Sequence, residues 1–94
     1  MGTGAAGLDF AVRTRDGVDF WPEINFIVKG YPAEQAKLWN SDAILEVNGY
    51  SLRNLDHAEC LKIFKGDAGR KLRLKIWRWP NEVFYVNLVM APRN

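Results

Sequence analysis

The sequence predicts a small α+β domain, an antiparallel barrel or sandwich of five to six strands with two helices at its open edges. Apolar and polar residues alternate in several short segments, which is typical of strands. Helix-capping residues and turn dipeptides lie between these segments. With 94 residues, 48% of them hydrophobic, the chain is long enough for one compact core but too short for two domains.

The first predicted strand follows a short stretch of small residues. Residues 1–6 favour a flexible leader, which leaves a single domain over residues 7–91. Leu8, Phe10 and Val12 alternate with polar or small residues, so the sequence predicts a strand with one buried face.

A turn and a loop are expected after this strand. Asp16-Gly17 is a turn dipeptide, and Pro22 indicates the end of a loop. This loop would expose two aromatic side chains, Phe20 and Trp21. A second strand is expected over residues 24–29, although its apolar residues do not alternate clearly.

The middle of the chain predicts a short helix and a hairpin. Pro32 suits the first turn of a helix, because the N–H group that it lacks would have no partner there, and residues 33–37 are good helix formers. Residues 43–47 predict a strand. Asn48-Gly49 tolerates the positive φ angles of a tight turn into the next strand.

A longer helix is expected over residues 56–65. Asp56 is a suitable N-cap, and Gly66 is suited to ending the helix. The apolar residues between them recur at spacings of three and four, namely Cys60, Leu61 and Phe64.

Two strands joined by a turn complete the predicted domain. Apolar and basic residues alternate over residues 71–76, and Pro80-Asn81 is typical of a turn. Residues 83–90 alternate again and place four apolar side chains on one face: Phe84, Val86, Leu88 and Met90.

The composition argues against several classes of protein. Cys60 is the only cysteine, so an internal disulfide is excluded, and no apolar run of about 18 residues could cross a bilayer. No secretion signal is recognisable, so we expect a cytoplasmic protein that reaches the inner face of a membrane only through partners. The net charge of +2 is too small to indicate nucleic acid binding.

Catalysis and metal binding are not expected either. His57 and Cys60 lie three residues apart on one predicted helix, whereas thiol enzymes take the base and the nucleophile from separate elements. The sequence contains no cluster of metal-ligating residues and no phosphate-binding or G-x-S-x-G motif. We therefore expect no catalytic activity, no cofactor and no metal ion.

Three motifs stand in series in the middle of the chain. They are G-x-P-A from Gly30, A-x-L-x-x-S-D from Ala36 and I-L-x-V-N-G from Ile44, and His57 follows at the start of the longer helix. This series resembles the centre of a PDZ domain, a module that binds the free C-termini of other proteins. Ser41 departs from the family pattern, which usually has Gly at that position.

The resemblance covers about residues 7–78, but the ends of the chain differ from the usual order. A typical PDZ domain has one more strand before the position of Gly7, whereas this chain has an extra strand after the usual last one. A hairpin of residues 71–79 with 83–90 would place the extra strand where the first one is missing, which would be a circular permutation. The alternative is a missing first strand and a last strand that extends the sheet elsewhere.

The resemblance places the carboxylate-binding loop of a PDZ domain at Gly7-Leu8-Asp9-Phe10. Backbone N–H groups of such a loop converge on the terminal carboxylate of the ligand. Asp9 stands where the family usually has Gly, so the resemblance implies an unusual backbone at Asp9 and a negative charge close to the anion. Weakened affinity is the expected result.

Side-chain contacts with the ligand are implied in the same way. His57 would bind a Ser or Thr hydroxyl two residues before the end of the ligand, while Arg13 and Lys65 could meet acidic residues upstream. An apolar pocket would enclose the terminal side chain, although the same apolar residues could be ordinary core. The full set expected to bind peptide is Gly7, Leu8, Asp9, Phe10, Ala11, Val12, Arg13, Asn25, His57, Leu61, Phe64 and Lys65.

The function expected from the resemblance is scaffolding through C-termini of the form Ser/Thr-x-hydrophobic, bound by strand addition. One alternative is a lipid-docking or dimer-forming module with a vestigial groove, and another is a domain that positions substrates for a protease in a larger protein. Lys71, Arg73 and Lys75 could contact anionic lipid weakly, with about 1 kcal/mol per charge near the surface. Such a row is more often the solvated side of a strand.

Overall fold

The computed structural model describes residues 4–93 and contains eight strands and two helices in that range. The principal sheet is antiparallel and has the strand order β2-β3-β4-β6-β7, with β5 paired to β4. β1 and β8 form a separate two-stranded ribbon. In chain order the elements are β1 (Gly4–Ala5), β2 (Leu8–Thr14), β3 (Phe20–Ile27), α1 (Pro32–Gln35), β4 (Ala43–Val47), β5 (Tyr50–Ser51), α2 (His57–Phe64), β6 (Lys71–Arg78), β7 (Glu82–Val89) and β8 (Ala91–Pro92).

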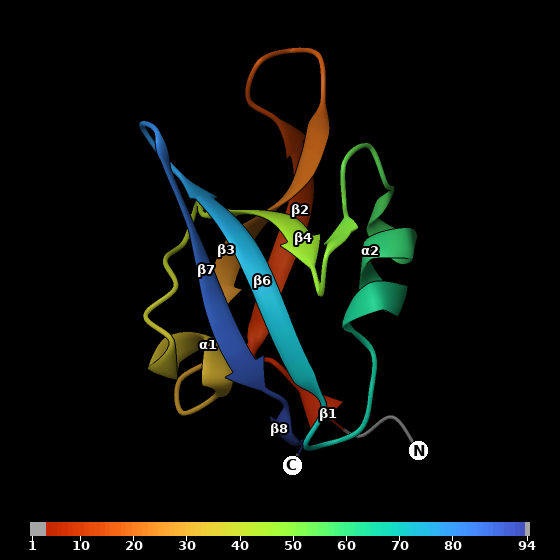
Figure 1. The fold of residues 1–94 in the computed structure, drawn as a ribbon, viewed down its shortest axis with the longest axis vertical. Coiled ribbons are helices and arrows are strands. Elements are labelled where there is room, and N and C mark those ends of the chain that lie inside the picture. Colours follow the sequence, from red (N-terminus) through yellow and green to blue (C-terminus); the bar gives the residue numbers. More distant parts are fainter. Residues whose placement is uncertain (1–3, 94) are drawn as a thin grey trace.

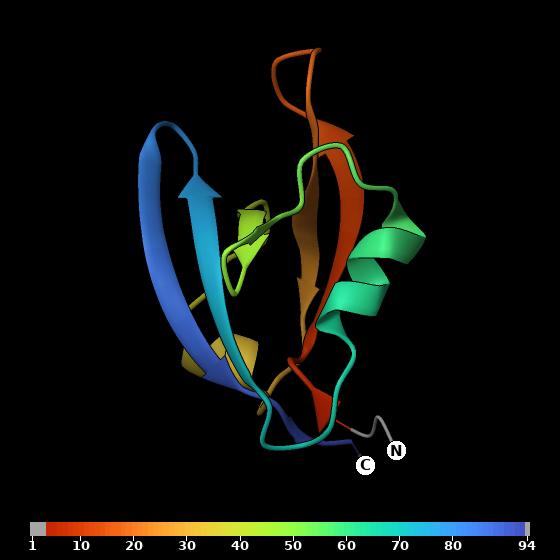
Figure 2. The same ribbon diagram turned by 45° about the vertical axis from the view of Figure 1, so that its right-hand side comes forward.

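The sheet bends so that its two ends face each other as two layers (Figures 1 and 2). Figure 2 shows β6 and β7 on one side and β2 and β3 on the other. α2 lies beside β2, and the β1–β8 ribbon closes one end of the molecule. The expected α+β sandwich with two helices is thus confirmed.

One apolar core fills the space between the two layers. Leu72, Leu74 and Ile76 of β6 are at most 1% exposed, and Leu88 and Met90 are 3% exposed. Each fully buried side chain of this size contributes about 1.5–3 kcal/mol to stability. The C-terminal hairpin therefore supplies a large part of the core.

The predicted C-terminal hairpin is confirmed. β6 and β7 pair along their whole length, from Lys71 opposite Val89 to Arg78 opposite Glu82. β7 thus forms the edge of the sheet next to β6, which is the place that the permuted arrangement gives to the last strand.

Local signals in the sequence account for the turn after β4 and the start of α2. Asn48 and Gly49 have φ angles of 52° and 81°, as expected for the tight turn into β5. The Asp56 carboxylate accepts a hydrogen bond of 2.8 Å from the backbone N–H of Glu59, and the Glu59 carboxylate accepts one of 3.0 Å from the N–H of Asp56. This reciprocal capping box fixes the start of α2 at His57.

The flexible leader expected over residues 1–6 does not extend to residues 4–6. Gly4 and Ala5 pair with Pro92 and Ala91, and Ala6 is only 8% exposed, so the ordered domain begins before Gly7. The partners lie at the far end of the chain, where no local pattern in the sequence could indicate them. Residues 1–3 lie outside the described range.

The loop expected before Pro22 is also wrong, because β3 already begins at Phe20 and Pro22 pairs with Val12. The backbone of Ile24 faces β4, since its N–H donates to the carbonyl of Asp42 over 2.8 Å. Because backbone directions alternate along a strand, the backbone of Pro22 also faces the β4 side, but it lies beyond the point where β3 and β4 stop pairing. The β3–β4 ladder therefore needs no hydrogen bond from an N–H group at this proline.

A buried ion pair connects the segment before β4 to the end of β6. Asp42 is 1% exposed, and its carboxylate accepts two hydrogen bonds of 2.8 and 2.9 Å from the Arg78 guanidinium. Arg78 also stacks on Trp39, with 3.6 Å from its Cζ to the ring centroid. The hydrogen bonds from Arg78 to the Asp42 carboxylate raise the pKa of Arg78 above its ordinary value, so the guanidinium stays charged.

Candidate functional site

A groove runs between β2 and α2 along the free edge of the principal sheet. Among residues 4–93, β2 is the last strand on this side, so no described strand pairs with its outer backbone groups. The carbonyl oxygen of Phe10 faces α2, because it lies 3.3 Å from Nε2 of His57. Alternation along the strand turns the backbone groups of Leu8 and Val12 the same way. An extended peptide could therefore pair with this edge.

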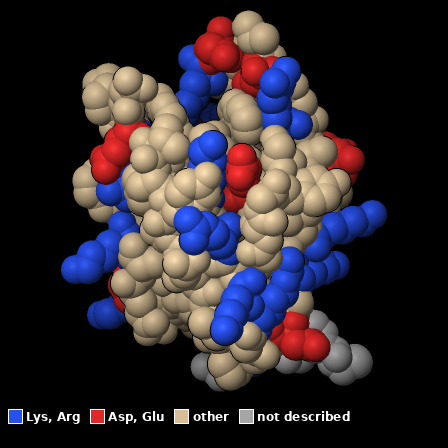
Figure 3. Space-filling view, in the orientation of Figure 1, with Lys and Arg blue, Asp and Glu red and all other residues tan. Residues whose placement is uncertain are grey.

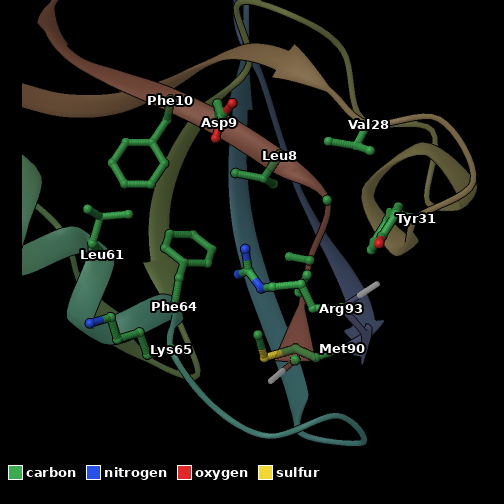
Figure 4. A pocket seen from close by; sticks show the side chains of 14 residues that line it. Leu8, Asp9, Phe10, Val28, Tyr31, Leu61, Phe64, Lys65, Met90 and Arg93 are labelled. Carbon is green, nitrogen blue, oxygen red and sulfur yellow. The ribbon is translucent and has the colours of Figure 1, made fainter. Parts of the chain in front are cut away.

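A pocket of about 700 Å³ lies where β2 begins (Figure 4). Its walls come from the start of β2, the last turn of α2, the segment before α1 and the β1–β8 ribbon. It is lined by seven of the residues that the sequence analysis placed at a peptide site: Gly7, Leu8, Asp9, Phe10, Leu61, Phe64 and Lys65.

Gly7 is required by the backbone at the entrance to β2. Its φ angle is +82°, and a Cβ atom there would lie 2.1 Å from Cβ of Tyr31. Its carbonyl accepts a 2.8 Å hydrogen bond from the N–H of Val28, which ties the start of β2 to the end of β3. The chain can therefore pass close to Tyr31 only because residue 7 has no side chain.

The unusual backbone expected at Asp9 is instead found at Gly7. Asp9 lies inside β2 opposite Phe26 and is not among the residues with positive φ. Its side chain is exposed, whereas the side chains of Leu8 and Phe10 on either side are partly or fully buried. Strand alternation explains this difference, so replacing Asp9 with glycine would relieve no backbone strain.

Three aromatic rings, those of Phe10, His57 and Phe64, pack together between β2 and α2. The ring of Phe10 lies 4.8 Å from the ring of His57 and 5.6 Å from that of Phe64, measured between centroids. Phe10 is 6% exposed, so it is part of the core as well as of the pocket wall. His57 is held at the first position of α2 by the capping box, and it is an exposed residue whose Nε2 contacts the Phe10 carbonyl of β2.

The PDZ domain family model matches residues 6–77. This chain belongs to the PDZ family. It is also 32% identical over 74 residues to the carboxy-terminal processing protease CtpA of Bacillus subtilis. That match covers 77% of this chain and 15% of CtpA, so the chain spans only a small part of this relative.

Solved structures share the fold of this PDZ domain. The PDZ domain of the carboxy-terminal protease from Vibrio cholerae, solved in complex with a peptide, superposes with a TM-score of 0.73 at 21% identity, over 94% of this chain and 95% of that one. The photosystem II D1 C-terminal processing protease gives a TM-score of 0.80 at 20% identity, over all of this chain and 26% of that protein. The PDZ domain thus resembles those of carboxy-terminal proteases in fold.

Five of the expected peptide-binding residues of the PDZ domain lie outside the pocket, and one of them is His57 at the start of α2. Ala11, Val12 and Arg13 continue along β2, and the Arg13 guanidinium lies 3.9 Å from the Glu23 carboxylate. Asn25 is exposed on β3 at the irregularity where the β2–β3 register shifts. These residues could meet only the upstream part of a peptide.

Sequence reasoning missed half of the pocket of the PDZ domain. Tyr31 and Val28 come from the segment before α1, and the remaining residues come from the β1–β8 ribbon and its surroundings, namely Gly4, Ala5, Ala6, Met90 and Arg93. The sequence shows a basic residue at Arg93, but the position of this residue in the fold depends on pairing between residues far apart in the chain. No local pattern could have located it.

The single thiol of the PDZ domain is buried inside α2. Cys60 is 0% exposed, and burial, with smaller contributions from Asp56 and Glu59, raises the pKa of its thiol above the ordinary value. A raised pKa keeps the thiol protonated and therefore a poor nucleophile. Within residues 4–93, no group of His, Cys, Asp and Glu could hold a metal ion, and no helix is long and apolar enough to cross a membrane. The absence of catalysis stays a prediction.

The basic row on β6 is part of a mixed surface. Arg73 stacks on the ring of Tyr85 at 4.4 Å, and the Lys75 amine lies 3.7 Å from the Glu46 carboxylate. Lys71 is exposed at the start of the strand. Figure 3 shows basic and acidic side chains among wide uncharged areas on this face of the molecule. Weak contact with anionic lipid through this row stays a prediction.

Proposed function

We propose that this PDZ domain binds the free C-terminal end of partner proteins as an added strand beside β2. The observation that carries the proposal is the open edge of β2, which faces α2 and leads into a pocket that begins at Gly7. Main-chain hydrogen bonds to the edge would provide affinity, and the pocket would accept the last side chain. The PDZ domain from Vibrio cholerae, which was solved with a peptide, supports this reading.

His57 supports a preference for Ser or Thr two residues before the end of the ligand. An added strand would pair with the outward backbone groups of Phe10, whose carbonyl now lies beside Nε2 of His57. The peptide would therefore displace this contact and leave the imidazole free for a hydroxyl group of the ligand. Apolar walls from Leu8 and Phe64 favour Val, Leu, Ile or Phe as the last residue.

A titration with four peptides tests both parts of the proposal. Fluorescein-labelled peptides ending in Ser-Ala-Val and Ala-Ala-Val, each as free acid and as amide, are bound to the wild type and to His57→Ala. We expect the wild type to bind the acids and to bind the amides much more weakly. We also expect it to prefer Ser by about 1 kcal/mol, the contribution of one hydrogen bond, and His57→Ala to lose this preference.

Two outcomes would contradict the proposal. Equal binding of acid and amide by the wild type would exclude recognition of a free C-terminus. Equal discrimination between Ser and Ala in both proteins would remove His57 from the ligand site, while leaving strand addition at β2 intact.

The similarity to CtpA supports a second candidate, a domain that holds substrates for a protease elsewhere in a longer protein. Binding at β2 would be the same in both cases, and only the partner would differ. This domain alone would then bind the peptide without cutting it. Mass spectrometry of the peptides after the titration shows whether they are still intact. Cleavage by the domain alone would contradict both candidates.

A further inference from the structure

The pocket contains a basic side chain, that of Arg93, which belongs neither to the PDZ sequence motifs nor to the edge of β2. Arg93 follows β8 and lines the pocket together with Leu8 and Phe64. Figure 4 shows its guanidinium group pointing into the pocket, whereas the Lys65 amine extends away from it. Arg93 is therefore the cation that faces the space in which a ligand would end.

The fold holds Arg93 in this position from two sides. Pro92 and Ala91 pair with Gly4 and Ala5, so the backbone leading to Arg93 is part of the β1–β8 ribbon. The N–H of Gly4 donates a 2.9 Å hydrogen bond to the carbonyl of Gly66, which ties the ribbon to the segment after α2. The residue that follows the ribbon thus lies close to both the start of β2 and the end of α2.

Arg93 has no carboxylate partner within the described range, residues 4–93. The carboxylate of Asp9, the acidic residue of the pocket lining, is exposed on the opposite side of β2 from the Leu8 and Phe10 side chains. Arg93 is exposed at the open pocket and has no counter-ion among the described residues. Its guanidinium is therefore available for charge-assisted hydrogen bonds to an anionic ligand.

We propose that Arg93 forms the ion pair with the terminal carboxylate of a bound peptide, an inference that rests on the proposed function. Guanidinium presents parallel N–H donors that match the two oxygens of a carboxylate, which a lysine amine cannot do. Arg93 thereby offsets the negative charge of Asp9 near the site. It is a specificity-determining residue for free C-termini, supplied by the last strand of the domain.

The experiment compares the free acid and the amide of the Ser-Ala-Val peptide on four proteins: wild type, Arg93→Gln, Arg93→Lys and Arg73→Gln. Arg73 serves as the matched control because it lies on β6 and stacks on Tyr85, away from the pocket. We expect Arg93→Gln to bind the acid about 10- to 100-fold more weakly, the range for a hydrogen-bonded charge, and to bind the amide as the wild type does. Arg93→Lys should lose less, and Arg73→Gln should match the wild type.

The failure of this inference is distinguishable from failure of the proposed function. If the wild type prefers the acid and Arg93→Gln keeps the same ratio of acid to amide affinity, peptide binding stands and the role of Arg93 is overturned. If the wild type binds both forms equally, both proposals fail. Circular dichroism of the variants checks that they are folded. If Arg93→Gln weakens the binding of acid and amide by the same factor, the inference is also overturned, because that result indicates a structural role.

Discussion

Single residues decide how the start of β2 is shaped. The family pattern placed Gly7 in the loop before β2. In the structure Gly7 has a left-handed backbone and lies very close to Tyr31. The same pattern misplaced the unusual backbone at Asp9, because a pattern of residue types does not record which residue turns before the strand begins. Arg93 could not be placed at all, since its position depends on pairing between the two ends of the chain.

Gly7→Ala should destabilise the domain strongly. A left-handed backbone costs alanine about 1–2 kcal/mol, and the clash of its Cβ with Tyr31 would add to this. Gly17→Ala is a matched control, because Gly17 has a φ of +77° but no atom within 4 Å of the new Cβ. Urea denaturation measures the two losses. Equal losses would mean that the contact with Tyr31 imposes no constraint.

Elements with local signals were predicted well, and elements defined by distant partners were not. The capping box of α2 and the Asn48-Gly49 turn each depend on residues within a few positions, so the sequence alone located them. β1 has only two residues and no alternation to detect, and it is a strand only because β8 lies beside it. Pro22 was wrongly assigned to a loop for a similar reason. A proline is tolerated at this position of β3 only because β4 no longer pairs with β3 there.

Asp56→Ala should destabilise α2 by about 1 kcal/mol, the usual cost of losing an N-cap. The Asp56 carboxylate satisfies the N–H of Glu59, which has no partner inside the helix. Asp56→Asn keeps an acceptor at the same position and should lose only a few tenths of a kcal/mol. Thermal unfolding followed by circular dichroism compares the two. A loss with Asn as large as that with Ala would assign the effect to charge instead of capping.

At the scale of the whole molecule, the two ends of the chain build the pocket together. The N-terminal ribbon strand leads into Gly7 and β2, and the C-terminal ribbon strand carries Arg93 to the same place. β7 connects this ribbon to the core, with Leu88 and Met90 buried close to it. Stability and the proposed carboxylate site therefore depend on different parts of the same C-terminal segment, which truncation can separate.

Removing residues 83–94 should unfold the domain, whereas removing residues 91–94 should not. The longer deletion takes away β7 and uncovers Leu72, Leu74 and Ile76, each worth about 1.5–3 kcal/mol when buried, in a domain whose net stability is only about 5–15 kcal/mol. The shorter deletion keeps β7 and the bonds of Met90 to Arg70 and Gly69, and it removes only β8 and Arg93. Circular dichroism and peptide titration of both truncations check this. A folded product of the longer deletion that still binds peptide would show that β7 is an addition to the sheet and not its missing strand, whereas full acid preference in the shorter one would contradict a carboxylate site built by the C-terminal ribbon.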